Sequence, residues 1–382
     1  MEHDNRYRDF YVDLSSIHKN RLHGVSGMMR VKNDAEFIEL CIESCIDALD
    51  ELVIVYNDCT DNSPEIIKKM AAKYPDKIRY YEYLPWLYCG ALSKREYDNA
   101  KELPNDSIHL LSNYYNYALS KTTYKYVMKI DADQIYFADE LTQICDLYRK
   151  RRISIPTFKE LLSFIKCLYK FKIHDGVIDV NTILLYQKCL KKFIRMFKFQ
   201  ISLSGINLCC GEDSRWLIPL GKISDGVSIL PPYNGVGDHI IFKVTKNTFF
   251  IPYDCVDYAT VTGANFVYIE KLVGYGRSFP YGIVWWHLNA CRKNIYKRQI
   301  KNVENYPDRY LDIDSFLKSD ANNLMNTIES IMPSKIISYL VSLFQIIKLK
   351  ESLFANLKQS SYNPITGFKW QLYGKERKAS DN

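Results

Sequence analysis

The sequence predicts an α/β fold with a mostly parallel sheet, a helical insertion and a helical C-terminal region. Two observations support this prediction. Between residues 24 and 133, runs typical of buried strands alternate with amphipathic helical patterns, as they do when crossover helices join parallel strands. From residue 147 to 200 the pattern becomes helical and rich in Lys, Phe, Tyr and Leu, and strand-like sequence returns at 200–210.

The first strand is predicted over residues 24–31, where GVSGMMRV is apolar and a polar turn follows. A helical pattern then runs to Leu49, after an Asp that can cap it. The second strand, 51–56, is rich in β-branched residues and ends at the polar cluster 57–63.

A helix is expected from Ser63 to about residue 73, because Pro64 suits a first helical turn. Strand 77–83 follows, and a helix over 108–121 precedes the strand 126–130. In parallel sheets, ligands bind beyond the carboxyl ends of the strands. We therefore expect the acidic residues that follow residues 56 and 130 to face a ligand.

The 382 residues carry a net charge of +7, and the charge is unevenly distributed. Residues 149–198 hold thirteen Lys or Arg against three Asp or Glu, a local balance of +10. Such a segment favours an anionic partner, and residues 336–347 form an amphipathic pattern too short to span a bilayer. The eleven cysteines include no C-x-x-C pair, and the N-terminus is polar, so a reducing, cytoplasmic location is expected.

Asp131-Ala132-Asp133 is the sharpest chemical feature of the sequence. Two carboxylates spaced i, i+2 after a strand can reach one hard divalent cation, or a cation and a ribose. Taken alone the pattern is weak, because a solvated loop after a strand has the same composition. Its context is informative: an Asn at 116 and a basic turn precede it, and two polar clusters, 30–33 and 57–61, follow earlier strands.

With these motifs in this order, the sequence resembles the family-2-like glycosyltransferases of GT-A fold. The resemblance covers residues 24–135 well and residues 200–290 loosely, and it leaves out the basic segment and the C-terminal helices. Asn57 stands where the family usually has an Asp, and the cluster is one residue shorter.

The resemblance implies a nucleotide-sugar donor, linked to uridine diphosphate, and a Mn²⁺ or Mg²⁺ cofactor. It implies nucleotide-sugar contacts from Arg30, Asn57, Asp58, Asn116, Asp131 and Ala132, and metal ligands in Asp131 and Asp133. His287, which ends the aromatic run Val284-Trp285-Trp286, is the candidate for a further metal ligand, and a core histidine is the alternative.

A transfer that inverts the anomeric carbon needs a general base for the acceptor hydroxyl. Asp238, at the end of a glycine-rich turn, is the first candidate, and Asp213, in a Glu-Asp pair similar to the family's acceptor motif, is the second. A structural role for both carboxylates is the third interpretation.

We expect an inverting hexosyltransferase that moves galactose or galactofuranose to a glycan or lipid-linked glycan at an anionic membrane surface. The expected segments are a nucleotide-sugar half (1–146), a basic helical insertion (147–200), an acceptor half (201–300) and a helical end (301–382). The alternatives are a metal-dependent nucleotidyltransferase, or a nucleic-acid-binding protein through residues 149–198, although no nucleic-acid partner is expected. Neither a G-x-S-x-G elbow nor a P-loop is present.

Overall fold

The computed structural model describes residues 5–89, 92–150, 153–173, 180–210, 216–220, 233–234, 240–254, 266–274, 278–312 and 315. The chain divides into two compact units. Unit 1 comprises residues 1–132, 226–229 and 239–278, and unit 2 comprises 133–225, 230–238 and 279–382. The chain passes from unit 1 to unit 2 inside the Asp-Ala-Asp motif. The four-segment division expected from the sequence remains a prediction.

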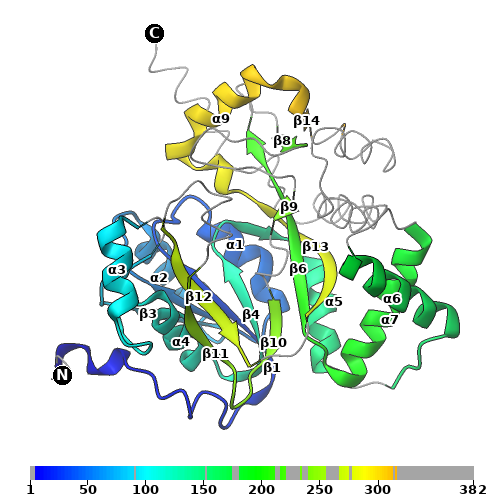
Figure 1. Cartoon of the computed structure of the whole chain (residues 1–382), viewed down its shortest axis with the longest axis horizontal. Helices are drawn as coiled ribbons and strands as arrows, with labels where there is room; N and C mark the ends of the chain where they lie inside the picture. The colour runs from blue at the N-terminus through cyan, green and yellow to red at the C-terminus, as the bar shows by residue number, and fades with distance from the viewer. Residues whose placement is uncertain are drawn as a thin grey trace. The chain divides into compact units, whose positions relative to one another are not determined.

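Unit 1 is built on a parallel sheet whose strands follow the order β3-β2-β1-β4 (Figure 1). A further strand, β10, pairs with β4 in antiparallel fashion. The elements of this part are β1 (Leu22–Val31), α1 (Ile38–Cys45), η2 (Ile46–Ala48), β2 (Glu51–Tyr56), α2 (Ser63–Lys73), β3 (Ile78–Glu82), β4 (Tyr124–Asp131) and β10 (Ile240–Lys243). These parallel pairings confirm the predicted α/β alternation with a mostly parallel sheet. The prediction was possible because a local change from apolar to polar sequence marks the strand ends.

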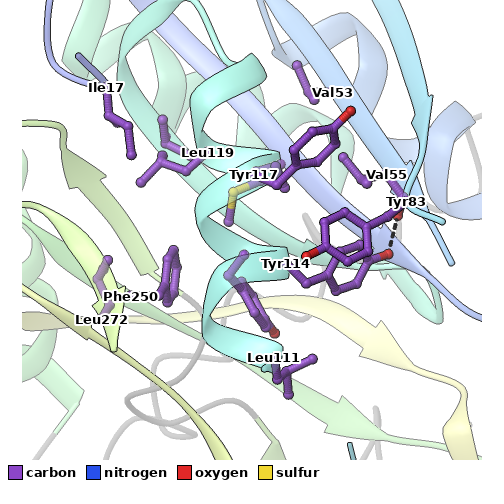
Figure 2. Packing of buried hydrophobic residues seen from close by; sticks show 14 of the residues in the cluster. Ile17, Val53, Val55, Tyr83, Leu111, Tyr114, Tyr117, Leu119, Phe250 and Leu272 are labelled. Carbon is purple, nitrogen blue, oxygen red and sulfur yellow. Dashed lines mark hydrogen bonds between the residues drawn. The ribbon is translucent and has the colours of Figure 1, made fainter. Parts of the chain in front are cut away.

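The core of unit 1 surrounds helix α4 (Leu111–Lys121). This helix packs against β1 and β2 and against the antiparallel hairpin of β11 (Phe249–Asp254) and β12 (Tyr268–Val273). Figure 2 shows Val53 and Val55 toward one side of the helix and Phe250 and Leu272 toward the other. The described part of unit 1 also contains η1 (Asn5–Phe10) and α3 (Lys94–Glu102).

Unit 2 holds two long parallel neighbours, β6 (Ile201–Asn207) and β13 (Phe279–His287). Strand β5 (Gln134–Tyr136) pairs antiparallel with the last residues of β13. The other elements of this part are α5 (Ala138–Arg149), β7 (Cys209–Cys210), β8 (Trp216–Pro219), β9 (Tyr233–Asn234), η3 (Asn289–Cys291), α9 (Lys293–Asn305), η4 (Pro307–Arg309) and β14 (Tyr310–Asp312).

A close approach fixes the pairing of β6 and β13. Trp285 is fully buried and lies opposite Gly205 in the strand pair. A Cβ on Gly205 would lie 2.0 Å from Trp285 Nε1, so only glycine leaves room for the indole. The register that Trp285 and Gly205 define also places the ends of the two strands together.

The basic segment forms a helical hairpin of α6 (Phe158–Ile173) and α7 (Val180–Phe197). Thr157 and Glu160 form a capping box at the start of α6: each backbone N–H donates to the other side chain. Several lysines of the segment bind inward. Lys191 and Lys192 form ion pairs with Glu140 and Glu160, at 3.4 and 2.8 Å. Part of the positive charge therefore holds the hairpin together.

Within the ranges that the structure describes, no helix is long and apolar enough to cross a membrane. The amphipathic pattern at 336–347 lies outside those ranges.

Candidate active site

Unit 2 brings Asp133 and His287 together at the ends of its strands. Asp133 immediately precedes β5, and His287 is the last residue of β13. The backbone N–H of Leu288 donates to the Asp133 carbonyl at 2.9 Å, which joins the two chain segments. His287 Nε2 lies 3.5 Å from Asp133 Oδ1, and both side chains are largely buried, at 13% and 9% exposed.

Asn207 holds the His287 ring in position. It is the last residue of β6 and pairs with His287 in the strand register, and its Oδ1 lies 2.6 Å from His287 Nδ1. When Nδ1–H donates to this oxygen, Nε2 is directed at Asp133. In that tautomer the lone pair of Nε2 faces a carboxylate oxygen, and the two would repel each other. A cation between them, either a proton or a metal ion, removes this repulsion.

Arg292 completes this site from the turn before α9. Its Nη2 donates to Asp133 Oδ2 at 2.9 Å, and its Nε donates to Asn289. Burial alone would raise the pKa of Asp133, but His287 and Arg292 outweigh it and hold that pKa well below its ordinary value. Asp133 is therefore a buried carboxylate that stays ionised.

These four residues fit a cation only in part. Among the residues that the structure describes, no group of three or more His, Cys, Asp and Glu side chains is placed to hold a metal. Asp133 and His287 supply one oxygen and one nitrogen, so phosphate oxygens of a bound ligand would have to supply the remaining ligands. A divalent cation held there would neutralise charge on a departing diphosphate.

Unit 1 places a second charged cluster at the carboxyl edge of its sheet. Arg30 and Asp131 are register partners on β1 and β4. The Arg30 guanidinium lies 3.9 Å from the ring centroid of Tyr115. Burial alone lowers the pKa of Arg30, but Tyr115, Glu270 and Asp131 outweigh it and raise that pKa, so the guanidinium stays charged.

Lys129 and Glu270 belong to the same cluster, and the sequence analysis did not identify them. They form a buried ion pair at 3.3 Å, between β4 and β12, with side chains 8% and 10% exposed. Lys129 Nζ lies 5.0 Å from the Tyr115 ring centroid, so two cations flank one phenol. No signal in the sequence could have found Glu270, because it is a single acidic residue within the mostly apolar run 266–273, in a hairpin that was not predicted.

The two predicted nucleotide-sugar contacts after β2, Asn57 and Asp58, differ in exposure. Asn57 is buried, and its amide donates to the carbonyls of Tyr83 and Pro85. Asp58 has a positive φ of 46° and a side chain that is 69% exposed, paired with Lys32 at 3.0 Å. Of the two, Asp58 presents its carboxylate to solvent, whereas Asn57 anchors the chain that follows β3.

The remaining predicted site residues fall into two groups. Asn116 is buried in α4, and both of its amide atoms bond to the Phe250 backbone at 2.8 Å. Ala132 is also buried. Asp213 and Asp238 lie outside the described residues. The structure therefore brings together Asp133 with His287, and Arg30 with Asp131, and the ligand roles of all these residues stay predictions.

Part of the chain matches a known enzyme family. Residues 7–193, just under half of the chain, match a family model described as Beta-1,4-N-acetylgalactosaminyltransferase (CgtA). This match agrees with the expected class, a glycosyltransferase. A search of curated proteins found no match.

Similarity to solved structures is limited to about a third of the chain. One is the glucosyl-3-phosphoglycerate synthase from Mycobacterium tuberculosis in complex with Mn²⁺, UDP-glucose and phosphoglyceric acid, at 17% identity and a TM-score of 0.20. That alignment covers 32% of this chain and 37% of the synthase. Another, described as a mycobacterial protein, has 14% identity and a TM-score of 0.21, covering 35% of this chain and 38% of that one. This chain thus spans well under half the length of each.

Proposed function

We propose that this glycosyltransferase is cation-dependent and inverting, and that it uses a uridine-diphosphate sugar as donor. The observation that carries the proposal is the buried, ionised Asp133, which faces the Nε2 of a histidine that Asn207 orients. A carboxylate oxygen beside an oriented imidazole is a pair suited to a divalent cation and a diphosphate. Asp131, two residues earlier and beside Arg30, is assigned to the donor's ribose on the strength of the sequence motif.

The reaction forms a bond between the acceptor oxygen and the anomeric carbon and breaks the bond from that carbon to the diphosphate. Asp133 and His287 would hold a cation that neutralises the leaving diphosphate, and Arg292 orients the Asp133 carboxylate through its ion pair. The acceptor proton passes to a carboxylate, for which Asp238 and then Asp213 remain the sequence-based candidates.

The family description sharpens the choice of sugar. It names N-acetylgalactosamine transfer to a β-1,4 linkage, and a β product from an α-linked nucleotide sugar supports inversion. We therefore place N-acetylgalactosamine ahead of galactose and galactofuranose as the donated sugar. The acceptor is proposed to be a glycan, free or lipid-linked, at the cytoplasmic face of an anionic membrane.

The test is transfer from a panel of uridine-diphosphate sugars, followed by mass spectrometry, with Mn²⁺, Mg²⁺ or EDTA. Asp133→Asn should lower turnover about 10²-fold or more, because a preorganised charge that acts on the leaving group is lost. Asp98→Asn is the matched control, since Asp98 is a carboxylate of α3 that forms an exposed i, i+4 ion pair with Lys94.

His287→Ala should weaken the binding of uridine diphosphate with Mn²⁺ more than without it. Equal weakening under both conditions would mean that the imidazole only packs. Undiminished transfer in EDTA would overturn cation dependence, and turnover of a nucleoside triphosphate in place of the sugar donors would favour the nucleotidyltransferase alternative.

A further inference from the structure

Helix α6 departs from the usual arrangement of a surface helix, because several of its large apolar side chains are exposed while polar ones are buried. Its residues Glu160, Ser163 and Cys167 are buried, at 6%, 8% and 0% exposed. Phe158, Leu162, Ile165 and Tyr169 are 74%, 51%, 56% and 64% exposed. These four apolar residues, hereafter the apolar ladder, recur at helical spacing and so form one stripe on the outer face.

The packing of α6 fixes this orientation. On its inner face, Phe164 stacks on Tyr186 of α7 with ring centroids 5.3 Å apart. Glu160, which caps the helix, also binds Lys192 of α7 at 2.8 Å. A rotation that buried the apolar ladder would expose Phe164 and break this ion pair. The ladder is therefore held outward by the fold.

The apolar surface continues before the helix. Ile153 and Ile155 are 84% and 77% exposed, the largest values among the exposed apolar side chains of the described residues. Neighbouring apolar side chains exposed together are unusual on a soluble surface and mark a contact site.

The charges around the ladder identify the contact. Lys159 and Lys166 are exposed beside it, whereas Glu160, the only acidic residue from 153 to 173, is buried against Lys192. A second copy of the same surface would bring like charges together. An apolar stripe with lysines at its margins matches an anionic lipid surface, where the stripe enters the acyl boundary and the ammonium groups reach the phosphates.

We propose that α6 is an interfacial membrane helix, which lies along an anionic bilayer surface with its apolar ladder facing the lipid. The proposal rests on the proposed function only in taking the acceptor to be membrane-held. The chain would attach to the bilayer mainly by inserting the apolar ladder of α6, and the lysines would add a salt-dependent attraction to the lipid phosphates.

Sedimentation of the full chain with vesicles tests this proposal. Leu162→Gln with Ile165→Gln should reduce partitioning to phosphatidylglycerol-containing vesicles about tenfold or more, because two large apolar side chains no longer leave water. Leu22→Gln with Leu84→Gln is the matched control, since these unit 1 side chains are each 59% exposed, and it should bind as the unaltered chain does.

Lys159→Gln with Lys166→Gln should weaken binding to anionic vesicles and flatten its salt dependence. Thermal melting confirms that each variant folds. Vesicle binding that survives the ladder substitutions, or an unaltered chain that ignores vesicles, would overturn the proposal. The proposal would also be overturned if light scattering showed a dimer that the ladder substitutions dissociate while vesicle binding persists.

Failure of the proposed function is separable from failure of this inference. If no nucleotide sugar is turned over while the ladder substitutions still abolish vesicle binding, the membrane helix stands and the enzyme assignment fails. If transfer to a soluble acceptor is intact while vesicles are ignored, the reverse holds.

Discussion

Helix α4 of unit 1 is more buried than its polar sequence suggests, and helix α6 of unit 2 is more exposed than its apolar sequence suggests. The α4 sequence, LSNYYNYALSK, is rich in amides and phenols, yet residues 111–119 are all buried. The α6 sequence is more apolar, yet five of its large apolar side chains are exposed, the apolar ladder and Leu161.

The difference lies in the partners that each helix has. In α4, Asn113 donates to the Phe10 carbonyl and the Tyr83 hydroxyl, and Tyr114 donates to the Val55 carbonyl. Every such contact compensates the loss of water at a buried polar group. In α6 each side chain of the apolar ladder is more than half exposed. Polarity of sequence therefore predicts burial poorly, and an apolar face without cover indicates an external partner.

Of the substitutions that test this comparison, removing the amide of Asn116 should lower the free energy of unfolding the most. Asn116→Leu leaves the N–H and C=O of Phe250 buried without partners, at a cost of about 2–4 kcal/mol in the free energy of unfolding. Urea unfolding without ligand measures it. A loss below about 0.5 kcal/mol would mean that α4 is held by apolar packing alone.

Tyr114→Phe should have a smaller effect. It deletes the hydroxyl that donates to the Val55 carbonyl at 2.7 Å but keeps the ring, so about 1 kcal/mol of stability should be lost. Chemical denaturation of the variant beside Tyr80→Phe, whose ring is 39% exposed, gives the contrast. Equal effects at both positions would remove the assigned role of the buried bond.

Acid should destabilise unit 1 through Glu51, which is also buried. Burial raises the pKa of Glu51, but hydrogen bonds from Ser26, Thr123 and Arg79 outweigh it and lower that pKa. A lowered folded-state pKa means that the unfolded chain binds the proton more readily. The stabilising contribution of Glu51 is then present above a pH of about 4.5 and is lost as the pH falls below that value. Melting temperature against pH should be flatter in Glu51→Gln, and parallel profiles would contradict this account.

Leu162→Gln in the apolar ladder should have the smallest effect. The side chain is 51% exposed and glutamine forms helices nearly as well as leucine, so stability should change by no more than about 0.5 kcal/mol. Urea unfolding compares it directly with Asn116→Leu. A loss above about 2 kcal/mol would place the ladder in a packed core and end the contrast between the helices.

The sequence by itself determined the α/β alternation of unit 1. Strand ends at Val31, Tyr56 and Asp131 are set by local changes from apolar to polar residues, and such changes need no distant partner. It also singled out Asp133, through the Asp-x-Asp pattern after a strand, and His287, through the tryptophans beside it; their ligand roles remain predictions. The T-x-x-E pattern at Thr157, which was not used in the prediction, is also local, and the structure shows that it begins α6.

Only the tertiary structure decided the partners of those residues. Arg292 lies 159 positions from the Asp133 that it binds, and Asn207 lies 80 positions from His287. Periodicity tells which face of an element is apolar, but the register of β6 against β13 follows from one large residue, Trp285, fitting over Gly205. The sequence could not show which face of α6 is exposed. The buried stripe of a helix depends on contacts such as that of Phe164 with Tyr186, which arise only when distant segments pack.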